Sequence, residues 1–195
     1  MTAPTVASPG FPECAEGDLI AAALAHGICG GISLRAAVDS DLPYLRQLYA
    51  GTREAEMAQV PWPPATRRAF LDQQFALQHA HYIANFPGAA FFLLQRETEP
   101  FGRYYLWRDA ADFLIVDISL DRRMQGLGIG SALIGRTHVL ASEAGLGVRL
   151  SVRRDNEAAR RLYERLGFLP IAGGEHAMHL PMRWEAPTGT APRTP

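Results

Sequence analysis

Cysteine, net charge and long hydrophobic runs are all scarce in this sequence of 195 residues. Its two cysteines, Cys14 and Cys29, both precede the expected domain, which argues against a disulfide framework and favours a reducing cytoplasm. Nineteen basic and twenty acidic residues give a formal charge of −1, so no overall field favours nucleic acid or an anionic membrane. The apolar run Leu19–Leu24 follows acidic residues and is too short to cross a bilayer, so neither a signal peptide nor a membrane anchor is expected.

What the sequence does contain is a glycine-rich run, Gln125–Ser131, in which three glycines alternate with apolar residues. The run follows a strand-like stretch, Phe113–Leu120, and precedes an expected helix. Glycine lets backbone N–H groups approach a ligand closely, and a helix N-terminus adds unpaired N–H donors and the positive end of the helix dipole. The run therefore predicts a binding site for phosphate or pyrophosphate.

The spacing of these glycines argues against two common phosphate-binding loops. A Walker loop needs a lysine directly after its last glycine, and no lysine stands here. A dinucleotide fingerprint needs G-x-G-x-x-G, but a start at Gly126 puts Ser131 at the third glycine, and a start at Gly128 puts Leu133 there. No acidic residue lies at the distance expected for binding a ribose. An NAD-dependent oxidoreductase is therefore disfavoured.

A second motif lies further along the chain, in Asn156–Phe168. Its apolar residues recur at the spacing of an amphipathic helix: Ala159, Leu162, Tyr163 and Leu166. Asn156 can cap this helix, and Gly167 suits its C-terminus. Apolar and polar residues alternate over 148–153, which is typical of a strand with two different faces. Further strands are expected at 32–37, 89–95, 102–107, 169–172 and 176–184, and helices from 39–41 onward and over 65–83.

Together, the Q-x-x-G-x-G pattern of Gln125–Gly130 and the N-x-x-A-x-x-L-Y-x-x-x-G-F pattern of Asn156–Phe168 resemble the GNAT superfamily of acyl-CoA-dependent N-acyltransferases. The resemblance covers about residues 31–184 and implies an α/β fold, with a central mixed, mostly antiparallel sheet of about seven strands and helices on both faces. The expected organisation is an N-terminal extension over 1–30, disordered up to about Gly17, that docks on the domain surface; a domain over 31–185; and a disordered tail over 186–195.

The resemblance also implies a role for each motif. The pyrophosphate of acetyl-CoA, the co-substrate, is expected on the loop residues Gln125, Gly126, Leu127, Gly128, Ile129, Gly130 and Ser131. The pantetheine arm is expected along the strand end, Ile118, Ser119 and Leu120, which also offers a backbone N–H to the acyl oxygen. Tyr163 matches the position that protonates the CoA sulfur, and Asn156 the position that bonds the pantetheine arm. The alternatives are a core tyrosine and a helix-capping asparagine.

The acceptor side carries fewer signals. Asp117 is a lone carboxylate in an apolar strand and a candidate general base, since buried acids have raised pKa values; the alternative is a carboxylate satisfied by an arginine or by backbone amides. Glu54 and Glu56 lie where the family builds its acceptor pocket, with a solvated acidic turn as the alternative. Tyr82 is expected near the same cleft, and no residue spacing suggests a metal site.

The expected function is transfer of an acetyl group from acetyl-CoA to a primary amine of a small molecule or peptide, by direct attack in a ternary complex. No nucleic acid or membrane partner is expected, and a homodimer stays open. The alternative function is a catalytically silent domain that binds acyl-CoA as a sensor or interaction module. The segment Gly51–Pro87, which is expected to decide the acceptor, carries no motif that identifies it.

Overall fold

A seven-stranded sheet forms the centre of the computed structural model, which describes residues 9–28, 30–172 and 178–187. The strands are β1 (Ile32–Ala36), β2 (Ala90–Arg96), β3 (Glu99–Arg108), β4 (Asp112–Leu120), β5 (Gly147–Arg153), β6 (Leu169–Pro170) and β7 (His179–Trp184). Their order is β1-β2-β3-β4-β5-β7-β6, and β4 and β5 are the one parallel pair of neighbours in this sheet. This confirms the mixed, mostly antiparallel sheet that the sequence predicted.

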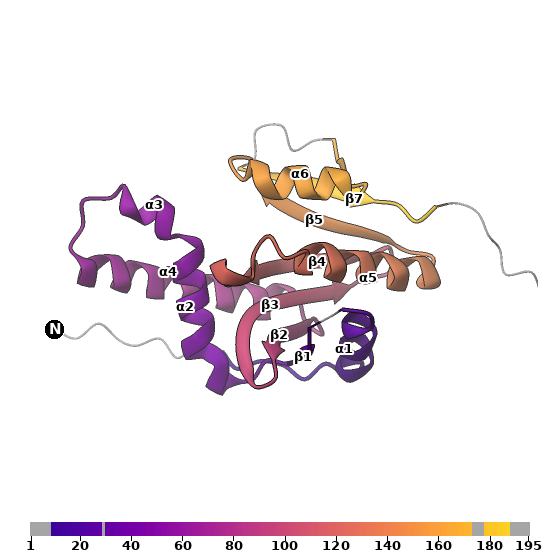
Figure 1. Ribbon diagram of the computed structural model, residues 1–195, viewed down its shortest axis with the longest axis horizontal. Helices are drawn as coiled ribbons and strands as arrows, with labels where there is room; N and C mark the ends of the chain where they lie inside the picture. Colours follow the sequence, from indigo (N-terminus) through magenta and orange to yellow (C-terminus); the bar gives the residue numbers. More distant parts are fainter. Residues whose placement is uncertain (1–8, 29, 173–177, 188–195) are drawn as a thin grey trace, which may run out of the picture.

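Helices cover both faces of this sheet (Figure 1). They are α1 (Gly17–Ala25), α2 (Leu42–Thr52), α3 (Glu54–Ala58), α4 (Pro64–Asn85), α5 (Ile129–Ala144) and α6 (Glu157–Arg165), with short 3-10 turns η1 (Asp39–Asp41) and η2 (Arg122–Met124). Strand alternation divides the core between the faces. Tyr104 packs with α1 and α5, and its hydroxyl lies 2.7 Å from Thr137 Oγ1, whereas Tyr105 packs on the other face with Phe91.

The N-terminal segment packs against the domain over its described residues. Leu24 of α1 is fully buried in the core, and the Phe11 ring lies 4.8 Å from the ring of His79 on α4. His79 Nε2 also lies 2.7 Å from the carbonyl oxygen of Pro9. The packed unit therefore begins at least as early as Pro9, well before the boundary at Gly17 that composition suggested.

Three local expectations need adjustment. The strand expected over 169–172 ends at Pro170, because Ile171 donates to the carbonyl oxygen of Pro181 (2.9 Å) but Pro181 has no N–H to return the bond. The strand expected from His176 is described from His179, and His176, like Cys29, lies outside the described residues. The acidic segment with Glu54 and Glu56 is a short helix, α3, rather than a turn. None of the helices in the described ranges is long and apolar enough to cross a membrane.

β3 and β4 approach each other closely at Gly102. A Cβ atom there would lie 2.7 Å from the carbonyl oxygen of Ser119 and 2.8 Å from Cδ2 of Leu120. We expect Gly102→Ala to lower the free energy of unfolding by about 1–3 kcal/mol, because the added methyl group overpacks the strand pair. Urea denaturation measures the change.

Gly135 provides the matched control, since a Cβ there would meet no described atom within 4 Å. Gly135→Ala lies inside α5 and should stabilise the protein by about 0.5–1 kcal/mol, because alanine loses less backbone entropy in a helix. Equal effects of the two substitutions would contradict the close approach at Gly102.

Candidate active site

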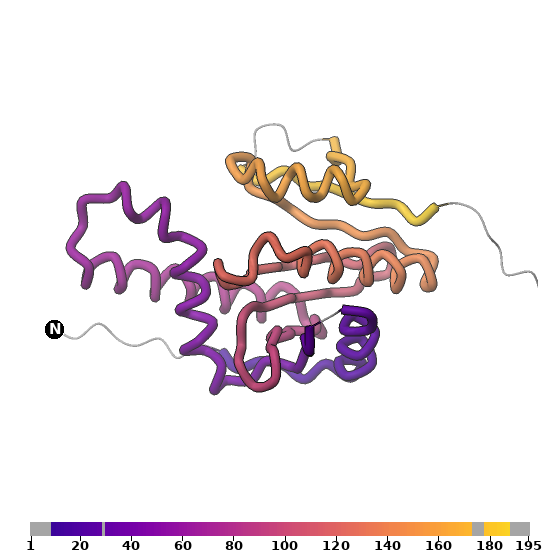
Figure 2. Tube along the Cα trace, viewed as in Figure 1, coloured from indigo at the N-terminus to yellow at the C-terminus, as the bar shows by residue number. Residues whose placement is uncertain are grey.

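The central strands β4 and β5 separate part of the way along their length. They pair from Asp112 and Gly147 to Ile115 and Leu150, and no further pair joins them within the described residues, although both strands continue. Figure 2 shows the two segments running together at one end and diverging toward the other. From Val116 onward every residue of β4 is only partly buried. The sheet therefore opens beside the strand end that was expected to line the pantetheine arm.

The glycine-rich run forms a loop at this open end of β4. Gly126 and Gly128 have φ angles of 74° and 79°, in the left-handed region that favours glycine, and Gly128 is the N-cap of α5. No side chain caps this end of the helix, so the first N–H groups of a 16-residue helix are free of such a partner. Gln125 Nε2 donates to the carbonyl oxygen of Leu120 (2.9 Å), a contact that fastens the loop to β4. This geometry fits an anion at the start of α5.

Tyr163 lies on α6, the helix that follows β5, and so belongs to the β5 side of the separation between β4 and β5. Asn156 Oδ1 accepts a hydrogen bond from the Ala159 N–H (3.1 Å), so Asn156 acts as the helix cap. The Tyr163 side chain is buried, and its ring lies 5.9 Å from the Phe168 ring. Burial and the charge of Asp117 raise the pKa of Tyr163 to about 12, so its hydroxyl is protonated at neutral pH. Among the described residues that hydroxyl has no hydrogen-bond partner.

Asp117 is fully engaged by other side chains. Its carboxylate accepts hydrogen bonds from Arg103 Nε (3.0 Å) and Nη2 (2.7 Å), from the Tyr82 hydroxyl (3.0 Å) and from Ser119 Oγ (2.7 Å). The Arg103 and Asp117 side chains are only 4% and 10% exposed. The structure thus has the ion-paired carboxylate that was the alternative to a general base. The Tyr82 hydroxyl, expected to face the acceptor, is committed to Asp117.

Sequence reasoning missed Arg103. The available signal was one arginine in the otherwise apolar stretch Phe101–Leu106. In the register of β3 and β4, Tyr105 faces Asp117 and Arg103 faces Ser119, so the arginine lies diagonally across from the carboxylate. A charged residue in each of two neighbouring apolar strands favours such a pair, because an unpaired buried charge is costly.

The two acidic residues of α3 lie near η2 and the end of β5. Glu56 Oε1 is 2.6 Å from Nη1 of Arg153, which ends β5, and 3.2 Å from Nη1 of Arg53. Partial burial, and then the charge of Asp155, raise the pKa of Glu56. Glu54 is more exposed, with its nearest basic contact at 4.0 Å from Arg122 in η2. The Glu56–Arg153 pair therefore links α3 to the end of β5 beyond the point where β4 and β5 separate.

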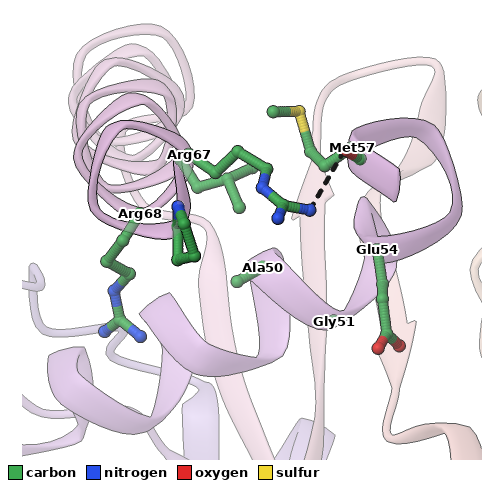
Figure 3. Close-up of a pocket in the computed structure, with 8 residues that line it drawn as sticks. Ala50, Gly51, Glu54, Met57, Arg67 and Arg68 are labelled. Atoms are coloured by element: carbon green, nitrogen blue, oxygen red, sulfur yellow. Dashed lines mark hydrogen bonds between the residues drawn. The ribbon is translucent and has the colours of Figure 1, made fainter. Parts of the chain in front are cut away.

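A pocket of about 410 Å³ lies between α2, α3 and the first turns of α4. Its lining residues are Ala50, Gly51, Glu54, Met57, Pro64, Arg67, Arg68 and Leu71. Arg67 reaches across to the Met57 carbonyl oxygen (3.4 Å), whereas Arg68 and Glu54 point away (Figure 3). Neither Tyr163 nor the glycine loop lines this pocket, so it is distinct from the place where β4 and β5 separate. In the described part of the chain no group of three or more metal-ligating side chains is present.

Known proteins share both the sequence pattern and the fold. Residues 42–168 match the acetyltransferase (GNAT) family. N-alpha-acetyltransferase RimI of Mycobacterium tuberculosis (strain ATCC 25618 / H37Rv) is 32% identical over 113 residues, which span 55% of this chain and 61% of that protein, less than two thirds of its length.

Two solved structures share the fold. PaiA N-acetyltransferase from Thermoplasma acidophilum, in complex with coenzyme A, superimposes with a TM-score of 0.60 at 15% identity, over 80% of this chain and 99% of that one. The ribosomal-protein-S18-alanine N-acetyltransferase from Escherichia coli gives a TM-score of 0.54 at 17% identity, over 84% and 99% of the chains. With the family match over residues 42–168, the chain belongs to the acetyltransferase (GNAT) family.

Proposed function

We propose that this protein is an N-acetyltransferase that moves the acetyl group of acetyl-CoA to an amine in a ternary complex. One observation carries the proposal: β4 separates from β5 over the stretch that leads into the glycine loop at the start of α5, and a buried, protonated tyrosine, Tyr163, lies on α6 within reach of the charge of Asp117 on that stretch. The RimI relative is named as an N-alpha-acetyltransferase, which makes the N-terminal amine of a peptide the first acceptor to try. The reducing environment that the few cysteines favour fits a cytoplasmic enzyme.

The donor would bind along the open edge of β4. Its pyrophosphate would lie on the N–H groups that follow Gly128, where the helix dipole favours negative charge. Its pantetheine arm would follow Ile118, Ser119 and Leu120, and a backbone N–H of this strand end would donate to the thioester oxygen as negative charge develops there. The side-chain amide of Asn156, whose oxygen caps α6, would donate to the arm.

The reaction would need no covalent enzyme intermediate. The lone pair of the neutral amine attacks the thioester carbon, a C–N bond forms, and the C–S bond breaks. Tyr163 donates its proton to the departing sulfur, while the nitrogen releases one proton to solvent and the Tyr163 oxygen regains one. Asp117 takes no part as a base here, because both of its carboxylate oxygens already accept hydrogen bonds from Arg103, Tyr82 and Ser119.

The acceptor would approach beside α3. Glu56 is half-exposed, and within the described ranges its close partners are the guanidinium groups of Arg153 and Arg53, so an incoming ammonium group can compete for its carboxylate. Glu54 would add negative charge at the same helix. These two carboxylates favour a cationic acceptor over an anionic one.

An amine panel tests the proposal directly. Release of free CoA from acetyl-CoA should saturate with at least one of a set of amines, amino acids, aminoglycosides and peptides with free N-termini. Acetyl-CoA, but not NAD, should raise the melting temperature. A melting shift without turnover on any acceptor would instead favour the acyl-CoA-binding sensor, and no shift at all would contradict both functions.

The charge of Glu56 should matter for the acceptor and not for the donor. We expect Glu56→Gln to raise KM for the amine about three- to fivefold, as fits one exposed charge contact, with KM for acetyl-CoA unchanged. Steady-state kinetics with each substrate varied in turn measure the two constants. Glu164→Gln is the matched control, since Glu164 is also half-exposed and paired with an arginine, Arg160, but on α6. An equal change of KM for the amine in both variants would contradict a role of Glu56 in binding the acceptor and would make it an ordinary solvated side chain.

A further inference from the structure

The end of β4 is supported by one neighbouring strand alone. Past Ile115, β4 no longer pairs with β5, whereas its pairing with β3 continues to the residue pair Gly102 and Leu120. A strand with one free edge lacks half of the hydrogen bonds that fix a strand inside a sheet. Residues 118–120, which the proposed function places along the thioester, therefore depend on β3 and on side chains for their position.

A single buried carboxylate joins this strand end to its surroundings. Arg103 of β3 binds both oxygens of Asp117 through Nε and Nη2, and Nη2 also donates to Gln78 Oε1 of α4 (2.8 Å). Tyr82, one turn further along α4, donates to the same carboxylate. The fourth donor is Ser119 Oγ, two residues along β4. Two strands and one helix thus meet at Asp117.

Arginine suits this junction better than lysine would. Its planar guanidinium group offers parallel N–H donors that match the two carboxylate oxygens, so the pair fixes direction as well as distance. The Arg103 guanidinium also lies over the Tyr105 ring, 5.2 Å from the ring centroid. Burial strengthens each of these contacts, because little water competes for the charges.

We propose that Arg103 is a positioning residue for acetyl transfer: through Asp117 and Ser119 it holds residues 118–120 of β4 in line with the thioester. Arg103 itself, only 3% exposed, does not reach the donor. The inference rests on the proposed function, because it assigns a task to the strand end that this function uses. It also gives Asp117 a role in place of the general base.

The test is Arg103→Lys, which keeps the positive charge and removes the planar guanidinium group with its parallel N–H donors. The ammonium group of lysine cannot hold both oxygens of Asp117 and Gln78 in the same directions, so the strand end should shift. We expect kcat to fall by about 100-fold, as for a small misplacement of reacting groups, while the Kd of acetyl-CoA from calorimetry stays unchanged. A merely structural role would lower the folded fraction instead and leave kcat per folded molecule unchanged.

Arg183→Lys is the matched control at the other end of the same strand. Arg183 binds Asp112 through Nε (3.1 Å) and Nη2 (2.9 Å), where β4 is paired with both neighbours. It should therefore leave kcat unchanged. If Arg103→Lys folds poorly, Arg103→Met combined with Asp117→Leu removes both buried charges, which preserves folding better than removing one, and should show the same loss of kcat.

Three results separate the possible outcomes. Turnover of a folded Arg103 variant within about twofold of the wild type would overturn the positioning role, because the strand end would then hold its place without the guanidinium group. An equal loss in Arg183→Lys would overturn it too, since an arginine–aspartate pair at the other end of β4 would then have the same effect. Absence of acetyl transfer by the wild type itself, over the whole amine panel, would contradict the proposed function.

Discussion

Tyr163→Phe is expected to lower kcat about 100-fold at saturating substrates, the effect of losing a general acid. The substitution keeps the ring that packs on Phe168 and removes only the hydroxyl. Because that hydroxyl has no partner among the described residues, its removal strands no donor or acceptor, and the free energy of unfolding should hardly change. The Kd of acetyl-CoA should also stay the same, since the contact to sulfur strengthens only in the transition state. Steady-state kinetics, calorimetry and urea denaturation measure the three quantities.

Tyr104→Phe is the matched control, a second buried tyrosine whose hydroxyl is bonded. Its oxygen lies 2.7 Å from Thr137 Oγ1, so its loss should lower the free energy of unfolding by about 1 kcal/mol and leave kcat unchanged. The two tyrosines should thus separate stability from catalysis. Turnover of Tyr163→Phe within about twofold of the wild type would remove Tyr163 from the mechanism.

Gly128→Val is expected to abolish binding of acetyl-CoA. Gly128 has a φ of 79°, which a β-branched residue adopts only with strain, so the loop should rearrange and its N–H groups turn away from the pyrophosphate. Calorimetry with acetyl-CoA measures the loss directly. Gly130→Val should act in the same direction for another reason: its φ is ordinary, but an added Cβ would lie 3.6 Å from Cδ1 of Ile118, so the larger side chain would crowd the strand end proposed for the donor.

The opposite end of the same helix supplies the control for the strain. Gly145 is the C-cap of α5 with a φ of 68°, and an added Cβ would meet no described atom within 4 Å. Gly145→Val should therefore cost similar stability and leave the Kd of acetyl-CoA unchanged. Equal affinity in the wild type and in both loop variants would contradict the assignment of the pyrophosphate to this loop.

Much of the architecture was predictable because its causes are local. Alternation of apolar and polar residues predicted β5, where Val148, Leu150 and Val152 are all buried. Helical spacing predicted α6 with Tyr163 on its buried side, and the glycine spacing predicted the turn into α5. Each of these features depends on residues within a few positions of one another.

The missed features depend on residues that lie far apart in sequence. For Asp117 the sequence left two readings open, a general base and a carboxylate satisfied by an arginine or by backbone amides, because the partner, Arg103, lies on the neighbouring strand and is identified only with the register. The contact of Glu56 with Arg153 joins positions 97 residues apart and needs the three-dimensional arrangement of α3 and β5. The alternation pattern of one strand predicts on which face of the sheet a side chain lies, but it does not predict which charged residue of a neighbouring element lies next to it.

Because the N-terminal segment packs on the domain, the folded unit is longer than residues 42–168, the range that matches the family. The family match starts at residue 42, yet Leu24 closes the core beside α5, and Phe11 packs near Tyr105, whose ring supports the Arg103 guanidinium. A fragment trimmed to residues 42–168 would expose apolar surface on one side of the sheet and remove the aromatic contacts of Phe11 on the other. Chain outside the homologous block is thus joined by direct packing to the residues that steady the proposed site of acetyl transfer.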